Sequence, residues 1–169
     1  EIYNSYGGKV TWIYRNYPIA SLHPKAPHEA EALECANELG GVDKFWLYTD
    51  KIYETTTSNN SLDPLELPKI AEAVGLDVVS FNKCLSSGKY TDKITEDIKN
   101  AQKAGGQGTP YSVIITKKDI SSGTKILINN AFGQYIQAVS YDSVKKNIIG
   151  VSGAMPLDTM KKALDILLK

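Results

Sequence analysis

The chain has 169 residues, of which 42% are hydrophobic, so it can bury a sizeable core without disulfide or metal staples. Its 19 lysine and arginine residues balance 19 aspartate and glutamate residues, and this even balance argues against a nucleic-acid partner or an anionic membrane surface. No apolar run approaches the roughly 18 residues of a membrane span, and no secretion signal is recognisable, so the sequence predicts a soluble folded domain.

The first predicted element is a strand at residues 10–14, which follows a turn at Gly7-Gly8 and is rich in β-branched and aromatic side chains. Because its apolar run is almost continuous, we expect burial on both faces, as in a parallel sheet. Trp12 in this strand and Trp46 further along the chain are expected to be core aromatics.

A block of helices is predicted over residues 27–104, because apolar side chains recur there at three- and four-residue spacing. The first helix begins near Pro27 and ends at Gly40-Gly41, with Glu34 among the glutamates that lie off its apolar stripe. The remaining helices of the block are expected around residues 43–54, 67–74, 78–85 and 94–101.

After this block the spacing of apolar residues becomes that of strands at residues 111–116 and 125–128, with a polar turn between them. Residues 141–147 are interpreted as a short helix, and a final helix begins near Pro156. The predicted order is therefore strand, helical block, strand, strand and helix.

The most informative short stretch is Gly108-Thr109-Pro110-Tyr111, which precedes a strand expected to be buried. Proline cannot donate a hydrogen bond to a sheet ladder, so Pro110 belongs at the start or the edge of that strand. From the residues alone the Thr109–Pro110 bond is either trans, the usual state, or cis, which about 5% of such bonds adopt.

Two cysteines, Cys35 and Cys84, are too few for a zinc site and fit either one disulfide or two buried thiols. Neither has another cysteine at the Cys-x-x-Cys spacing of thiol–disulfide enzymes. His23 and His28 lie close in sequence without further ligands at a suitable spacing, so neither a metal nor a cofactor is expected.

Several motifs, in their order and spacing, resemble those of the DsbA-like thioredoxin family: Gly8-Lys9-Val10, Tyr14-Arg15-Asn16-Tyr17-Pro18, His23-Pro24, Glu34-Cys35-Ala36, Lys44-Phe45-Trp46, Gly75-Leu76-Asp77, Cys84-Leu85, Gly108-Thr109-Pro110 and Gly153-Ala154-Met155-Pro156. The resemblance implies an α/β, thioredoxin-like fold with a helical insertion between the second core strand and the cis-proline strand. It implies one domain over residues 1–169, with residues 1–26 and 105–169 as the thioredoxin part and residues 27–104 as the insertion.

In this family a thiolate at a helix N-terminus attacks disulfides, and a cis-proline beside it helps to hold the substrate. The resemblance implies that Thr109 and Pro110 form the substrate-docking part of the site, with Gly108 and Tyr111 lining the same surface. The catalytic cysteines would precede Gly8, so residues 1–6 are interpreted as the tail of their helix. The 169 residues by themselves are therefore predicted to be inactive.

The resemblance also places a central strand, leading into the catalytic helix, between residues 10–14 and residues 111–116. No segment of the sequence is left for this strand, and unpaired strand edges are unfavourable. We expect the gap to be filled by an N-terminal segment outside the 169 residues, by a strand swapped from a second chain, or by a rearranged strand from residues 124–152.

Relatives of this branch often carry cysteines at both positions, so the resemblance favours a Cys35–Cys84 disulfide and an extracytoplasmic protein that is periplasmic, secreted or membrane-tethered. The implied partners are polypeptides with thiols or disulfides and a membrane redox protein of the DsbB or VKOR type. Two other functions stay open: a non-catalytic polypeptide-binding or structural module, and a glutathione-dependent transferase or isomerase.

Overall fold

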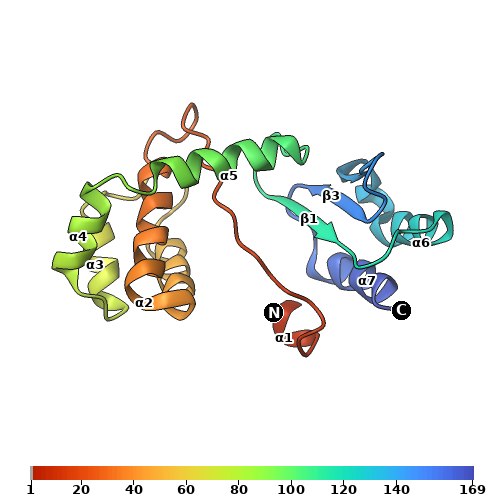
Figure 1. Ribbon diagram of the computed structural model, residues 1–169, viewed down its shortest axis with the longest axis horizontal. Helices are drawn as coiled ribbons and strands as arrows, with labels where there is room; N and C mark the ends of the chain where they lie inside the picture. The colour runs from red at the N-terminus through yellow and green to blue at the C-terminus, as the bar shows by residue number, and fades with distance from the viewer. Residues whose placement is uncertain (1) are drawn as a thin grey trace. The chain divides into compact units, whose positions relative to one another are not determined.

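The computed structural model describes residues 2–169, which form two compact units (Figure 1). The sheet unit contains residues 2–15 and Asn100–Lys169, and the helical unit contains Asn16–Lys99. Each unit has its own buried apolar residues. The expectation of one domain with an insertion at residues 27–104 stays a prediction.

The helical unit contains the elements α2 (Ala26–Thr55), α3 (Glu66–Ala73), α4 (Val78–Ser86) and the first part of α5 (Thr91–Lys103). All the predicted helices of this block are confirmed. The two that were expected on either side of Gly40-Gly41 are the two halves of α2, which is interrupted at Gly41 with φ 72° and ψ −171°. Glycine allows this positive φ because it has no Cβ.

The core of the helical unit lies where α2 packs against α3 and α4. The Tyr48 ring of α2 lies 5.4 Å from the Phe81 ring of α4, between ring centroids, and both side chains are fully buried. The Tyr48 hydroxyl donates a hydrogen bond to the Leu67 carbonyl oxygen over 2.9 Å, so the polar end of this core aromatic is satisfied. Burial raises the pKa of Tyr48 strongly, which keeps the phenol neutral.

The sheet unit contains a three-stranded antiparallel sheet in the order β1-β3-β2. Its elements in chain order are α1 (Ile2–Ser5), the end of α5, β1 (Tyr111–Ile115), α6 (Ser122–Phe132), the 3₁₀ helix η1 (Gly133–Ala138), β2 (Val139–Tyr141), β3 (Ile148–Ser152) and α7 (Leu157–Leu167). The predicted strand at residues 111–116 and the predicted C-terminal helix are confirmed.

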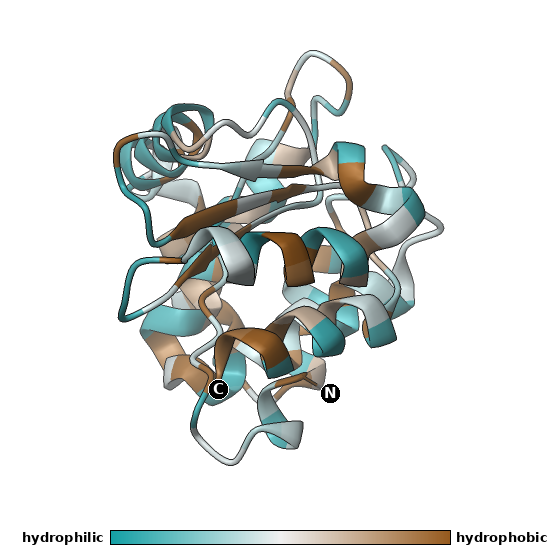
Figure 2. Ribbon diagram, turned by 90° about the vertical axis from the view of Figure 1, so that its right-hand side faces the viewer, coloured by the Kyte–Doolittle hydropathy of each residue, from teal (hydrophilic) through white to brown (hydrophobic). Residues whose placement is uncertain are grey.

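One face of this sheet packs against α6 and α7. Ile149 and Val151 of β3 form a buried cluster with apolar side chains of these two helices, among them Ile128, Phe132 and Met160. Figure 2 shows the hydrophobic colour running along the strands and along parts of the helices beside them. Because strand side chains alternate, the neighbours of Ile149 and Val151 point to the opposite face of the sheet.

Two predicted elements after β1 are wrong. Residues 125–128 are not a strand but the middle of α6, whose start is capped by the Ser121 side chain accepting a hydrogen bond from the Thr124 backbone N–H. Residues 141–147 are not a helix: Tyr141 ends β2, and residues 142–147 form the turn that links β2 to β3. The Asp142 carboxylate accepts the backbone N–H groups of Val144 and Lys145, both over 2.8 Å, and so competes with helix formation.

Residues 10–14 do not form the predicted strand either. Trp12 is 49% exposed and Ile13 is 70% exposed, so the expectation that Trp12 is a core aromatic is wrong. A strand needs a hydrogen-bonded neighbour, and no segment within residues 2–169 pairs with residues 10–14. Trp46 is half-buried in α2, with its ring 5.3 Å from that of Phe45 in an edge-to-face arrangement.

Candidate polypeptide-docking edge

The candidate site is the open edge of β1, the edge that does not face β3. The Pro110 carbonyl oxygen accepts a hydrogen bond from the Gly153 backbone N–H, and the Thr116 backbone N–H donates to the Asn147 carbonyl oxygen. In an antiparallel ladder such pairs alternate along the strand, so Tyr111, Val113 and Ile115 direct their own backbone N–H and C=O groups away from β3. These groups have no strand partner within residues 2–169.

One of the three expectations for the gap beside β1 is therefore wrong. Residues 124–152 do not supply a rearranged strand at this edge, because they form α6, η1, β2 and β3. β3 pairs with the other edge of β1, where Ile114 lies opposite Ile149, and β2 lies beyond β3. The open edge remains available for a strand from outside the described residues.

Thr109 and Pro110 stand at the beginning of this edge, and both are exposed. The peptide bond between them is cis. The Pro110 carbonyl is fixed on β3 by its 2.8 Å bond from Gly153, whereas the backbone N–H and C=O of Thr109 have no hydrogen-bond partner among residues 2–169. An exposed, unpaired backbone donor and acceptor in line with an open strand edge can hydrogen-bond an extended peptide.

The Tyr111 side chain covers the face of the sheet that α6 and α7 leave free. Its hydroxyl donates a 2.5 Å hydrogen bond to the carbonyl oxygen of Ala104, just after α5. A Cβ added at Gly150 would overlap the Tyr111 hydroxyl, and one added at Gly106 would lie 3.1 Å from the ring. Glycine at these two positions lets the tyrosine lie flat across β3, which the sequence did not indicate.

Gly150→Ala is therefore expected to destabilise the sheet unit by about 1–3 kcal/mol, the usual penalty for overpacking a tight site. The added methyl group would meet both the Tyr111 hydroxyl and Ser140 Oγ, which lies 2.6 Å from its position. Urea unfolding followed by tyrosine and tryptophan fluorescence measures the change. In a Tyr111→Leu background the same substitution should be less destabilising, and an equal loss in both backgrounds would contradict the assigned contact.

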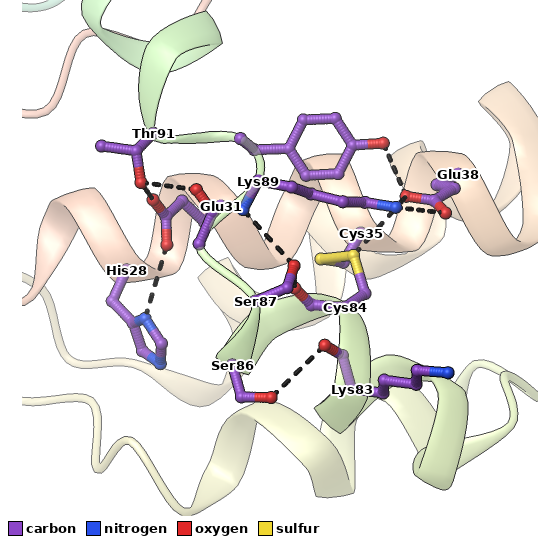
Figure 3. The surroundings of a disulfide bond; sticks show 12 residues. His28, Glu31, Cys35, Glu38, Lys83, Cys84, Ser86, Ser87, Lys89 and Thr91 are labelled. Atoms are coloured by element: carbon purple, nitrogen blue, oxygen red, sulfur yellow. Dashed lines mark hydrogen bonds and ion pairs between the residues drawn. A yellow bond between two sulfur atoms is a disulfide. The ribbon is translucent and has the colours of Figure 1, made fainter.

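The predicted disulfide between Cys35 and Cys84 is confirmed and joins α2 to α4 (Figure 3). The two Cα atoms are 5.9 Å apart, and the exposed fractions of the side chains are 0% and 7%. A Glu38 carboxylate oxygen lies 3.6 Å from Cys84 Sγ and is itself bound by the Lys89 ammonium and by the Tyr90 hydroxyl over 2.7 Å. These two hydrogen bonds hold the pKa of Glu38 below its ordinary value.

The helical unit contains a buried charged network of Glu34, Lys93 and Asp97 that was not predicted from the sequence. Glu34 is only 5% exposed although it lies off the predicted apolar stripe. Its Oε1 accepts hydrogen bonds from Lys93 Nζ over 2.7 Å and from Asn16 Nδ2 over 3.0 Å. Lys93 Nζ also lies 3.1 Å from Asp97 Oδ2, and Asp97 is 3% exposed. The four-residue spacing of Lys93 and Asp97 on one helix could have indicated their ion pair. Glu34 lies in another helix, and only the fold brings it to them.

Burial by itself would lower the pKa of Lys93, but the hydrogen bonds and charges of Glu34 and Asp97 outweigh this and raise it. A raised pKa means that the charged lysine stabilises the fold below its ordinary pKa and that this contribution is lost as the pH rises through the raised value.

Neither metal-binding groups nor membrane-spanning helices emerge in the described part of the chain. Within residues 2–169 no three His, Cys, Asp or Glu side chains are grouped so that they could hold a metal ion. No helix there is both long enough and apolar enough to cross a bilayer.

Comparison with known proteins places most of the chain in one family. A family model described as Thioredoxin matches residues 1–137. The structure is similar to that of DsbA2 from Pseudomonas aeruginosa, with a TM-score of 0.57 and 22% sequence identity. The likeness covers 90% of this chain and 69% of that one, and at this identity it concerns the fold.

Among curated proteins the chain is similar to short parts of Na⁺/H⁺ antiporters. It is 31% identical over 101 residues to NhaA 3 of Salinispora tropica, which is 60% of this chain and 15% of the antiporter. It is 25% identical over 120 residues to NhaA 1 of Mycolicibacterium gilvum, 70% of this chain and 18% of that protein. The chain thus spans less than a fifth of these relatives, and their transport activity is not carried over to it.

Proposed function

Because the chain belongs to the thioredoxin family and has a DsbA-like thioredoxin fold with a helical insertion, we propose that it is the polypeptide-docking part of a thiol–disulfide oxidoreductase. Its substrates are extracytoplasmic polypeptides with thiols or disulfides. The predicted fold class is confirmed by the family match and the structural likeness, whereas this activity is our inference.

The observation that carries the proposal is the open β1 edge headed by Thr109 and Pro110. It offers Thr109, Tyr111 and Val113 as successive backbone partners for an extended substrate. The strand YSVII contains no charged residue and no proline, the features that usually protect an edge from pairing. A substrate strand bound there would be held by backbone hydrogen bonds and therefore with little dependence on its sequence.

The chemistry requires a cysteine pair that these residues do not contain. Cys35 and Cys84 are joined to each other and leave no free thiol. In the exchange, a thiolate of the enzyme attacks one sulfur of a disulfide, a mixed disulfide forms, and the other sulfur leaves as a thiolate; a second cysteine then releases the product. In our proposal these cysteines precede Glu1 in the intact protein, and Thr109 and Pro110 hold the substrate beside them.

The isolated chain is expected to bind a short extended peptide with an S-alkylated cysteine at this edge, and Val113→Pro is expected to weaken binding about fivefold or more. The proline removes one donor on the open side, equivalent to roughly 1 kcal/mol, and leaves the β1–β3 ladder intact. NMR titration of the ¹⁵N-labelled chain measures the affinity and shows whether the amides of Thr109, Tyr111 and Val113 shift.

Val113→Thr is the matched control, because it keeps the N–H group and should leave the affinity nearly unchanged. Ser112→Pro differs by one position but removes a bond to Val151 of β3, so it should destabilise the fold instead. A folded Val113→Pro chain that binds the peptide as tightly as the original would contradict docking by strand addition.

Two observations separate this proposal from its competitors. Intact mass and N-terminal sequencing of the native protein should reveal a Cys-x-x-Cys segment ahead of Glu1; a mature protein that begins at Glu1 would favour the non-catalytic binding module. Glutathione binding measured by calorimetry would favour the glutathione-dependent enzyme, and we expect none at the Thr109–Pro110 end.

A further inference from the structure

The even charge of the whole chain conceals opposite charges on its two units. The sheet unit, residues 1–15 and 100–169, has 11 basic and five acidic residues. The helical unit, residues 16–99, has eight basic and 14 acidic residues. The neutral total therefore describes neither unit, and it does not exclude an anionic surface as a partner of the sheet unit. The sheet unit is clearly basic and can be attracted to anions.

Four lysines of the sheet unit gather at one end of the sheet. Lys117 and Lys118 follow the last residue of β1, and Lys145 and Lys146 precede the first residue of β3. β1 and β3 are antiparallel neighbours, so the end of one lies beside the beginning of the other. All four side chains are exposed. We call the two loops, residues 116–120 and 142–147, the lysine patch.

Three hydrogen bonds join the two loops of the lysine patch. The Thr116 backbone N–H donates to the Asn147 carbonyl oxygen over 3.0 Å, and Asn147 Nδ2 donates to the Thr116 carbonyl oxygen over 2.8 Å. The Ile120 backbone N–H donates to the Lys146 carbonyl oxygen over 2.9 Å. The lysines are therefore presented together by an ordered backbone, with little further ordering needed on binding.

These lysines have no ion-pair partner within residues 2–169. In the helical unit, by contrast, four of the eight lysines pair with carboxylates: Lys51, Lys69, Lys89 and Lys93. The patch does contain Asp119 and Asp142, which reduce its net charge from four to two. Asp142 accepts two backbone N–H groups of its own turn, and these, together with the nearby charge of Lys145, hold its pKa below the ordinary value.

One apolar side chain is exposed within the lysine patch, and two more are exposed on α6. Val144 is 83% exposed in the turn that carries Lys145 and Lys146. Lys125 in the first half of α6 stacks over the ring of Tyr141, with 4.8 Å from Nζ to the ring centroid, which fixes α6 beside this turn. The next residues of α6, Ile126 and Leu127, are 60% and 55% exposed.

We propose that the lysine patch docks the sheet unit on an anionic membrane surface, with Val144 entering the headgroup region. Lysines beside an exposed apolar side chain match the charged headgroups and the acyl boundary of an anionic bilayer. Thr109 precedes the opposite end of β1, seven residues or roughly 23 Å of extended chain from Thr116, the first residue of the patch. A docked domain would therefore keep its open edge accessible. The proposal does not depend on thiol chemistry.

The test is cosedimentation of the full chain with vesicles of phosphatidylglycerol and phosphatidylcholine at low salt. We expect binding that is absent with pure phosphatidylcholine and that weakens steeply as salt is added. Changing Lys117, Lys118, Lys145 and Lys146 to Gln should lower the partition coefficient at least a hundredfold, at about fivefold per lysine. Val144→Ser should lower it several-fold without changing the salt dependence.

The matched control replaces four other exposed lysines of the sheet unit, Lys9, Lys103, Lys162 and Lys169, with Gln and so has the same net charge. It should keep most of the binding. Equal losses in the two variants would overturn the assignment of the patch, as would equal binding to neutral vesicles. Absence of vesicle binding combined with binding to poly-glutamate would assign the patch to an acidic polypeptide and overturn the membrane proposal.

Discussion

Replacing Cys35 and Cys84 with alanine is expected to lower the free energy of unfolding of the helical unit by about 4 kcal/mol. The two cysteines are 49 positions apart, and in the chain-entropy model a disulfide that closes a loop of this size removes that much conformational freedom from the unfolded chain. The loop contains α2 from Cys35 onward, all of α3 and most of α4, so the effect should be confined to this unit.

Hydrogen–deuterium exchange of the two proteins measures this change unit by unit. Backbone amides in α2 and α4 should lose protection, whereas those in β1 and β3 should not. The single variant Cys35→Ala is the control and should lose nearly as much as the double variant, because neither can form the bond. Protection in α2 that changes by less than a factor of ten would contradict a stabilising role for the disulfide.

The helical unit was largely predictable from sequence because its signals are local. Glycines at 41, 75 and 88 have positive φ and punctuate the helices where the sequence indicated their ends. The strand at residues 111–115 was likewise signalled by β-branched residues after a proline. The Cys35–Cys84 bond needed the family resemblance, since spacing by itself left a disulfide and two thiols equally open.

The errors fall where the outcome depends on distant parts of the chain or on short apolar runs. Residues 125–128 are too few for the spacing of their apolar side chains to distinguish a strand from a helix. The Ser121 cap, which begins α6 just before them, favours the helix. Residues 10–14 have the composition of a strand, but they join no sheet within residues 2–169. The position of Thr109 at an open edge likewise follows from the register of β1 on β3, which no local pattern reveals.

Glu34 is the clearest example of a residue whose environment was not predictable. A glutamate off the apolar stripe of a helix is normally exposed, because burying a carboxylate without a partner is very unfavourable. Its partner Lys93 lies 59 residues further on, in another helix. A single substitution in the same network is expected to have the second large effect on stability.

Lys93→Met is expected to lower the free energy of unfolding by about 2–3 kcal/mol, because it leaves Glu34 and Asp97 buried without their common cation. Removing one partner of a fully buried ion pair lowers the free energy of unfolding by roughly 3–5 kcal/mol. We expect a smaller loss for Lys93→Met, because the Lys93 side chain is 42% exposed and its charge is partly screened by water. Methionine keeps much of the apolar stem, so packing changes little. Urea unfolding at neutral pH measures the difference.

Three companion variants separate buried charge from other causes. Lys93→Arg should retain most of the stability, since it keeps the cation. Lys51→Met removes a comparable contact to Glu54 but at an exposed pair, 45% and 65% exposed, and should change stability by less than about 0.5 kcal/mol. Adding Glu34→Gln to Lys93→Met should recover part of the loss, because one uncompensated charge is removed; a further loss of the same size would show that lost packing, rather than unpaired charge, destabilises the helical unit.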